Sequence, residues 1–310
     1  MAAGAHPGGS ARPRTGAGSL RPGARRERDR AGGWGRGVSA LRHGHAGSGA
    51  PGLREPVAAT PVASGFERAL AAVRDVEGWL SDDQARVLWE RARSVPPGGQ
   101  IVEIGSYRGR SAIVMARAAA GAAGVVAIDP HAGDDRGPQQ IRGSAEEGAA
   151  DNEAFVANLE RAGVTGAVRH VRLPSSEALH AVDGAIDLLY VDGAHRLGPA
   201  RDDVVRWGAR VRPGGTLLIH DAFSSIGVTL ALASTLFAGR DYAYAGRTRS
   251  LAEYRRVATP LRPPERVRNG ARQATELPWF ARNVLVKLAL VLRLRPLARL
   301  LGHRSGDWPY

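Results

Sequence analysis

The sequence has no cysteine, and this absence excludes several kinds of chemistry. Among its 310 residues there are only 2 methionines, and aromatic residues make up 5%. A chain without thiols forms no disulfides, thiolate metal sites or cysteine nucleophile, which fits a cytoplasmic protein. Aliphatic side chains and alanine must therefore fill the core, and a hydrophobic content of 43% is enough for one.

Lysine is almost as scarce, because Lys287 is the only one, although the net charge is +13. The positive charge lies at the two ends. Residues 1–65 hold 10 arginines against 3 acids, and residues 255–310 hold 12 basic residues against 3 acids. The segment between them is slightly acidic. A basic surface favours nucleic acid or an anionic membrane as a partner, and here that expectation applies only to the ends.

Residues 1–62 are rich in Gly, Ala, Arg and Pro and lack apolar periodicity. Such a segment buries too little apolar surface to offset the entropy of ordering, so we predict a disordered tail. No apolar run follows its first charges, so a secretory leader is not predicted. Three interpretations stay open, namely an upstream start codon wrongly chosen, a solvated tail, and a nucleic-acid-binding arm, of which the last is least favoured.

Short apolar runs alternate with helical segments over residues 63–258, which we predict to be one catalytic domain. The predicted strands cover residues 100–104, 124–129, 168–173, 186–192 and 215–220. The predicted helices include residues 111–120, 151–162 and 200–209. This alternation predicts an α/β, Rossmann-like, doubly wound fold with a mostly parallel sheet. Such sheets bind ligands at the carboxyl ends of their strands, which here carry Glu103, Asp129, Asp192 and the pair His220–Asp221.

Residues 259–310 are predicted to form a basic, amphipathic, helical C-terminal extension. Within its segment 278–301, Lys287, Arg293, Arg295 and Pro296 interrupt the apolar residues. The uncharged stretches are therefore too short to span a membrane, which takes about 20 apolar residues. Two interpretations have equal weight. The helix lies on an anionic membrane as a peripheral contact at its inner face, or it packs on the domain or on a second subunit as a homo-oligomer.

The first predicted strand runs into a glycine turn, Glu103-Ile-Gly105-Ser-Tyr-Arg-Gly109-Arg-Ser111. The glycines let the backbone approach a ligand closely. The spacing G-x-x-x-G departs from the dinucleotide pattern G-x-G-x-x-G, and the preceding acid suits a cationic ligand better than a pyrophosphate. Asp129 follows at the end of the second strand, where an acid binds ribose hydroxyls.

The turn from Glu103 to Ser111 resembles the first motif for S-adenosylmethionine (SAM) of the catechol O-methyltransferase branch. Val191-Asp192-Gly-Ala-His195 and the segment from Arg212 to Asp221 resemble later motifs of class I methyltransferases, in particular a bacterial subgroup related to macrolide-sugar O-methyltransferases. The resemblance covers roughly residues 65–254. It implies a seven-stranded sheet and SAM as the methyl donor.

The resemblance also implies roles for individual residues. Glu103, Gly105 and Gly109 border the methionine end of SAM, and Ser106 and Tyr107 offer contacts in the turn. Asp129 binds the ribose, and Asp192 lies beside the methyl donor. Ser175 and Ser176 contact the adenine.

His195 is the candidate general base, because an imidazole titrates near neutral pH and is suited to take the proton of a hydroxyl. The alternative is that His195 only packs or caps within its loop. The resemblance further implies a divalent cation, Mg²⁺ or another, held by Asp192 and Asp221. Its third ligand is in doubt, because Ala222 and His220 stand where related enzymes have an oxygen ligand.

Two segments are predicted to shape the substrate site. Residues 133–148 form a long polar loop, interpreted as a lid or as an inert loop. Residues 221–227 and 247–254 are expected to line the acceptor pocket.

The leading functional prediction is O-methylation of a hydroxyl on a small molecule, such as a secondary metabolite, or on a glycan or lipid-linked sugar. N-methylation stays open within the same class. A prediction from another functional class is that the chain is an inactive SAM-type fold. It would then bind a membrane or nucleic acid through its basic ends. A nicotinamide enzyme is disfavoured by the missing G-x-G-x-x-G.

Overall fold

The computed structural model describes residues 64–134 and 142–303, and the predicted tail, residues 1–62, lies outside them. Part of the predicted lid, residues 135–141, also lies outside. The described residues group together as one unit by their contacts. The strands are β1 Gln100–Ile104, β2 Gly124–Ile128, β3 Val168–Val171, β4 Ile186–Val191, β5 Val211–Ile219, β6 Tyr242–Thr248 and β7 Leu251–Arg256. The helices are α1 Gly65–Val73, α2 Asp82–Arg93, α3 Arg110–Ala119, α4 Ala145–Arg161, α5 Leu197–Asp202, α6 Ile226–Thr235, α7 Pro263–Ala274, α8 Leu277–Val291 and α9 Arg295–Leu300.

The strands form one seven-stranded sheet in the order β3-β2-β1-β4-β5-β7-β6. Strands β1 to β5 run parallel, whereas β7 is antiparallel to both β5 and β6. This confirms the predicted Rossmann-like, mostly parallel sheet. The chain order reverses between β1 and β4, and ligands of open α/β sheets bind at such a switch point.

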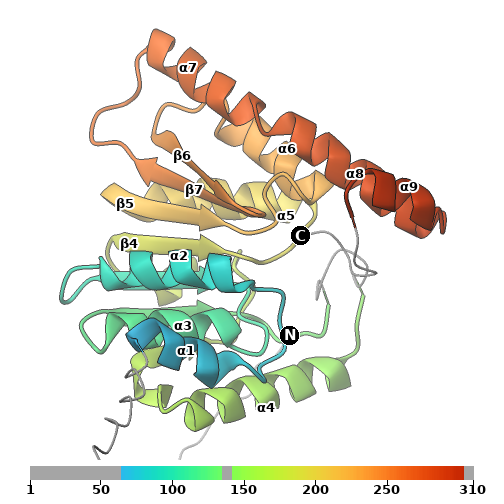
Figure 1. Ribbon diagram of the computed structural model, residues 1–310. Coiled ribbons are helices and arrows are strands. Elements are labelled where there is room, and N and C mark those ends of the chain that lie inside the picture. The colour runs from blue at the N-terminus through green and yellow to red at the C-terminus, as the bar shows by residue number, and fades with distance from the viewer. Residues whose placement is uncertain (1–63, 135–141, 304–310) are drawn as a thin grey trace, which may run out of the picture. The chain divides into compact units, whose positions relative to one another are not determined.

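Helices cover both faces of the sheet (Figure 1). One apolar cluster joins α1, α2, α3 and α4 to the sheet through side chains such as Leu88, Ile113 and Phe155. The other joins α6 and the segment after α5 to the opposite face through Trp207, Leu232 and Tyr254. β4 is buried along its whole length because it lies between these two layers.

Three helices begin at a serine whose side chain and third following residue cap each other, at Ser64, Ser81 and Ser144. Each pair satisfies backbone N–H groups that have no partner inside the helix. The cap at Ser144 starts α4 six residues before the predicted start at Asp151. The prediction was wrong there because residues 145–150 are small and acidic and show no apolar period.

The predicted helix at residues 200–209 is also irregular. α5 ends at Asp202 and continues as a π-helical turn, Asp203–Trp207, then as a 3₁₀ turn, Gly208–Arg210. π-helical turns are rare and occur frequently at functional sites.

The C-terminal extension packs on the antiparallel end of the sheet. From α7, Asn269 accepts a hydrogen bond from the Tyr244 backbone N at 2.8 Å, and Gln273 accepts one from the Tyr254 hydroxyl at 3.0 Å. From α8, the Lys287 ammonium donates to the Ser224 carbonyl at 2.8 Å. Within residues 64–134 and 142–303, no helix is long and apolar enough to cross a membrane.

Candidate active site

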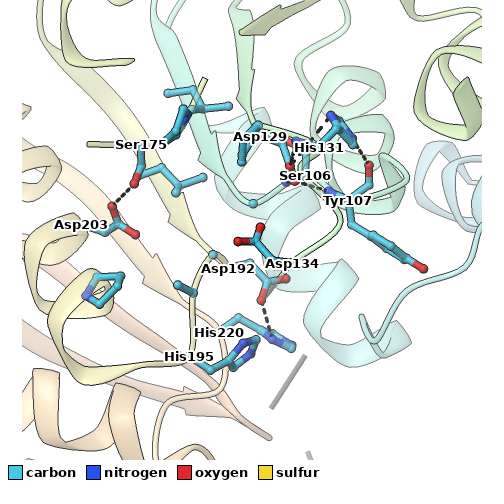
Figure 2. Close-up of a pocket in the computed structure, with 18 of the residues that line it drawn as sticks. Ser106, Tyr107, Asp129, His131, Asp134, Ser175, Asp192, His195, Asp203 and His220 are labelled. Atoms are coloured by element: carbon cyan, nitrogen blue, oxygen red, sulfur yellow. Dashed lines mark hydrogen bonds and ion pairs between the residues drawn. The ribbon is translucent and has the colours of Figure 1, made fainter. Parts of the chain in front are cut away.

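A cavity of about 650 Å³ opens at the carboxyl ends of β1, β2 and β4. This is an ordinary size for a small-molecule site, and its place is the one expected for this type of sheet. Figure 2 shows Ser175 and Asp203 on one side of it and Ser106, Tyr107 and Asp129 on the other, with Asp192 between them. The predicted site residues that line it are Gly105, Ser106, Tyr107, Asp129, Ser175, Ser176, Asp192, His195 and Asp221. Their roles toward a cofactor stay predictions.

The glycine turn forms the floor of the cavity. Gly105 has φ +83°, and a Cβ built there would stand 2.1 Å from the Asp192 carbonyl oxygen. Such closeness excludes any side chain, so β1 and β4 approach each other here only because residue 105 is glycine.

Asp129 holds this turn in place. Its carboxylate accepts hydrogen bonds from the backbone N–H groups of Ser106 at 2.9 Å, Tyr107 at 2.8 Å and His131 at 2.8 Å. A carboxylate has about four acceptor sites, so about one remains for a ligand hydroxyl. Asp129 therefore shapes the site besides lining it, a function that the sequence did not reveal.

Glu103 and Gly109 do not line the cavity. Glu103 is fully buried behind it and accepts a hydrogen bond from the Ser111 hydroxyl. Burial raises the pKa of Glu103 to about 8, even though hydrogen bonds from Ser111 and Ser106 favour the charged form. Gly109 has φ +87° and stands at the N-cap of α3, with Phe155 packed against it.

The opposite end of the cavity is built by Ser175, Asp203 and Trp207. The Ser175 hydroxyl donates to Asp203 at 2.5 Å, and the Trp207 indole donates to the Ser175 carbonyl at 3.1 Å. Burial raises the pKa of Asp203 to about 6. Asp203 and Trp207 were not predicted as site residues, because a regular helix over residues 200–209 gives no reason to turn both toward the cavity.

His195 and Asp221 form a hydrogen-bonded pair, with His195 Nε2 2.6 Å from Asp221 Oδ2. Burial would lower the pKa of His195, but the hydrogen bond and negative charge of Asp221 outweigh it and raise the pKa. Asp221 is held in the left-handed region, with φ +53°, in the turn that follows β5. This strained backbone brings two segments 26 residues apart into contact.

A second buried histidine stands beside this pair. His220 Nδ1 lies 3.0 Å from Asp192 Oδ1 and 3.7 Å from Asp221 Oδ1. Burial alone would lower its pKa, yet the two carboxylates raise it to about 9, so His220 is an imidazolium at neutral pH. The pKa of Asp221, which burial would raise, falls to about 2 beside this cation.

Tyr190 completes this cluster by donating its hydroxyl to Asp192 Oδ2 at 2.8 Å. It was missed, although the signal existed: residues two apart on one strand share a face, so Tyr190 and Asp192 had to point the same way.

The predicted metal ligands do not form a metal site of their own. Among the described residues, no group of three or more His, Cys, Asp or Glu side chains is arranged to hold a metal ion. His220 Nδ1, a hydrogen-bond donor in its charged form, is close to both Asp192 and Asp221. A divalent cation held by Asp192 and Asp221 therefore stays a prediction.

The mouth of the cavity carries Trp79, whose ring lies 5.5 Å from that of Tyr107. From the predicted lid, only Gly133 and Asp134 line the cavity among the described residues. Residues 247–254, expected to line an acceptor pocket, do not. They form part of the hairpin β6–β7, and the prediction was wrong because strand β7 inserts beside β5.

Acidic side chains predominate around the cavity, with eight carboxylates against four arginines. The carboxylates come from the ends of β2 and β4, from the turn after β5, from α4, α5 and the π-helical turn, and from loops. A site of this charge favours a cationic ligand.

The sheet order and the glycine turn define a Rossmann-like α/β fold, and acids at the strand ends line its cavity. Residues 102–222 match a family model described as a methyltransferase domain. That match runs from β1 through the turn that carries Asp221 and so includes most of the cavity. Residues 102–222 of the chain are therefore a methyltransferase domain.

Three solved structures are similar to this chain in outline. The cofactor-bound protein Rv0187 from MTB is 21% identical, with a TM-score of 0.45, over 63% of this chain and 90% of that one. The SAH-bound methyltransferase PaMTH1 of Podospora anserina is 18% identical, with a TM-score of 0.46, over 63% and 88%. The O-methyltransferase TomG of Streptomyces achromogenes, in complex with SAM, is 20% identical, with a TM-score of 0.40, over 63% and 88%.

Proposed function

We propose that the protein binds SAM in the cavity and transfers its methyl group to a hydroxyl of a small-molecule, glycan or lipid-linked acceptor. One observation carries this proposal. A single acidic cavity joins the glycine turn at Gly105, the carboxylate of Asp129 and the His195–Asp221 pair. The first two suit a cationic nucleoside ligand, and the third suits removal of a proton.

The reaction is an in-line displacement. The acceptor oxygen forms a bond to the methyl carbon while the sulfur–methyl bond breaks, and S-adenosylhomocysteine leaves with the electron pair on sulfur. The sulfonium is already activated, so the protein's main tasks are to align the two reactants and to accept the hydroxyl proton.

His195 is the proposed acceptor of that proton. Asp221 takes a hydrogen bond from Nε2, which leaves Nδ1 as the free base. Nδ1 is buried and has no partner among the described residues. Proton transfer through this atom therefore requires the ring or the loop at residues 192–196 to turn toward the acceptor.

We further propose that transfer needs no divalent cation. The His220 imidazolium neutralises the charge between Asp192 and Asp221 that a metal would otherwise neutralise. Addition of Mg²⁺ or removal of metals with EDTA is then expected to leave SAM affinity unchanged. An increase in SAM affinity with Mg²⁺ that the Asp221→Asn variant loses would restore these residues as metal ligands.

Calorimetric titration with SAM tests the cofactor assignment. Asp129→Ala is expected to weaken binding at least tenfold, because the turn loses its carboxylate and the ribose loses an acceptor. Asp241→Ala removes an exposed carboxylate outside the cavity and is the matched control. Failure of the unmodified protein to bind SAM, together with tight binding of NADH, would overturn the proposal.

The role of His195 has a separate test. His195→Gln is expected to keep SAM binding and to lose transfer in an acceptor screen, because Gln retains polarity but takes up no proton at neutral pH. If His195→Gln methylates an acceptor as fast as the unmodified protein, the base is another group.

A further inference from the structure

The C-terminal helices expose an unusual amount of apolar surface. Eight of the fifteen large apolar side chains that are exposed in the described part of the chain lie between Leu277 and Leu300. On α8 and at its C-cap, Leu285, Leu288 and Leu292 follow one another at helical spacing, while Val286 and Ala289 are buried. We call the exposed set the α8–α9 surface: Leu285, Leu288, Val291, Leu292, Leu294, Leu297 and Leu300.

Only cationic side chains accompany this apolar surface. Between residues 277 and 303 the sequence has five basic side chains and no acid. Two of the five are engaged inward, Lys287 with Ser224 and Arg282 with the Leu301 carbonyl. Arg293, Arg295 and Arg299 remain on the outside, among the exposed leucines.

We propose that the α8–α9 surface docks on an anionic lipid membrane. Exposed leucines interleaved with arginines match a bilayer interface, where the apolar side chains enter the acyl boundary and the arginines meet lipid phosphates. The helices lie in the interface and do not cross it, in keeping with their length.

Charge argues against the other occupants. A second copy placed on this surface would bring Arg293, Arg295 and Arg299 of both copies together without any acid to pair with them. Nucleic acid would satisfy the arginines but would leave the leucines against phosphates and water. A lipid surface satisfies both kinds of side chain.

The docking surface is linked to the catalytic side of the molecule. Lys287 lies on α8 between the exposed Leu285 and Leu288, and its ammonium contacts Ser224, three residues after Asp221. One helix therefore joins the proposed membrane contact to the turn that positions the His195 pair. The inference itself does not depend on the chemistry proposed for the cavity.

Co-sedimentation of the full chain with lipid vesicles tests the proposal. We expect binding to phosphatidylcholine vesicles that contain about 30% phosphatidylglycerol, little binding to phosphatidylcholine alone, and loss of binding in about 0.5 M salt. Replacing Arg293, Arg295 and Arg299 by Gln should weaken binding by about fivefold for each arginine. Replacing Leu297 and Leu300 by Glu should abolish it, because carboxylates would enter the interface.

Matched controls separate this surface from the overall positive charge. The first control replaces three other exposed arginines by Gln and so removes the same number of positive charges: Arg240, Arg268 and Arg272. Val267→Glu places a carboxylate on the exposed face of α7, where Val267 is 72% exposed. Both controls should bind vesicles nearly as well as the unmodified protein.

Three results would overturn the proposal. The unmodified chain does not bind anionic vesicles, or the surface variants bind as well as their controls. The third is a dimer in light scattering that the Leu297→Glu/Leu300→Glu variant dissociates while vesicle binding is absent, which would assign the surface to a second copy.

Discussion

Gly105 shows how tightly one position determines the site. A methyl group at this position would collide with the Asp192 carbonyl, which no rotamer relieves because the obstacle is backbone. Gly105→Ala is expected to lower stability by more than about 2 kcal/mol and to abolish SAM binding, because β1 and β4 must separate. Urea unfolding and SAM titration measure the two effects.

Gly124→Ala is the appropriate control, since nothing lies within 4 Å of a Cβ built there. A Gly105→Ala protein as stable as this control, with unchanged SAM affinity, would show that the turn is not as closely packed as described.

Glu103 makes the stability of the unliganded protein depend on pH. Its pKa is raised from 4.5 to about 8, so the folded state holds a proton that the unfolded state has lost between these values. Its contribution to stability is complete below pH 4.5 and falls as pH rises toward 8, by about 1.4 kcal/mol per pH unit. Glu103→Gln stays neutral, so the variant should gain stability relative to the unmodified protein between pH 5.5 and pH 8.

Urea unfolding of both proteins at the two pH values measures this difference. Parallel stability curves for the two proteins would mean that Glu103 is ionised in the folded state, with a partner for its charge.

The side chain of Lys287 helps to attach helix α8 to the active-site side. Lys287 donates to the Ser224 carbonyl at 2.8 Å and to its hydroxyl at 3.2 Å, and burial lowers the pKa of this lysine. Lys287→Met removes the donor, and we expect a loss of about 1–3 kcal/mol in the free energy of unfolding. Arg293→Met changes an exposed residue of the same extension and should stay within about 0.5 kcal/mol. Equal stability of the two variants would contradict the proposed attachment.

Local patterns predicted most of the parallel half of the fold. β1 was placed correctly because a buried apolar run ends at a glycine turn, and both features lie within ten residues. The start of β5 was harder to predict from the sequence. β5 begins at Val211 and not at Gly215, because its first residues pair with Ile186 across a bulge that no local period reveals. The π-helical turn at Asp203 likewise keeps an ordinary helical composition.

The site was predictable in its acids but not in their partners. Asp129, Asp192 and Asp221 were identified from their places at strand ends. That Asp129 binds the backbone of the glycine turn, and that His220 lies near Asp192, depends on contacts between residues 22 to 28 positions apart. Such contacts follow from the sheet order and not from any local spacing.

The seven-stranded sheet and the cavity are built from residues between Ser64 and His303. A chain that starts at Thr60 is therefore expected to unfold at the same urea concentration as the full chain and to bind SAM with the same affinity. A loss of either property would assign a structural role to residues 1–59.

The single lysine gives the protein a chemical reporter. Reagents that acylate amines have one lysine side chain to modify, and the ammonium of Lys287 is engaged with Ser224 beneath α8. Acylation at Lys287 should be slower while α8 is docked, because its ammonium is then hydrogen-bonded to Ser224. The rate at which Lys287 is labelled, measured by mass spectrometry, would thus report how often α8 separates from the domain. The measurement can be made in solution and on vesicles, and it needs no introduced probe.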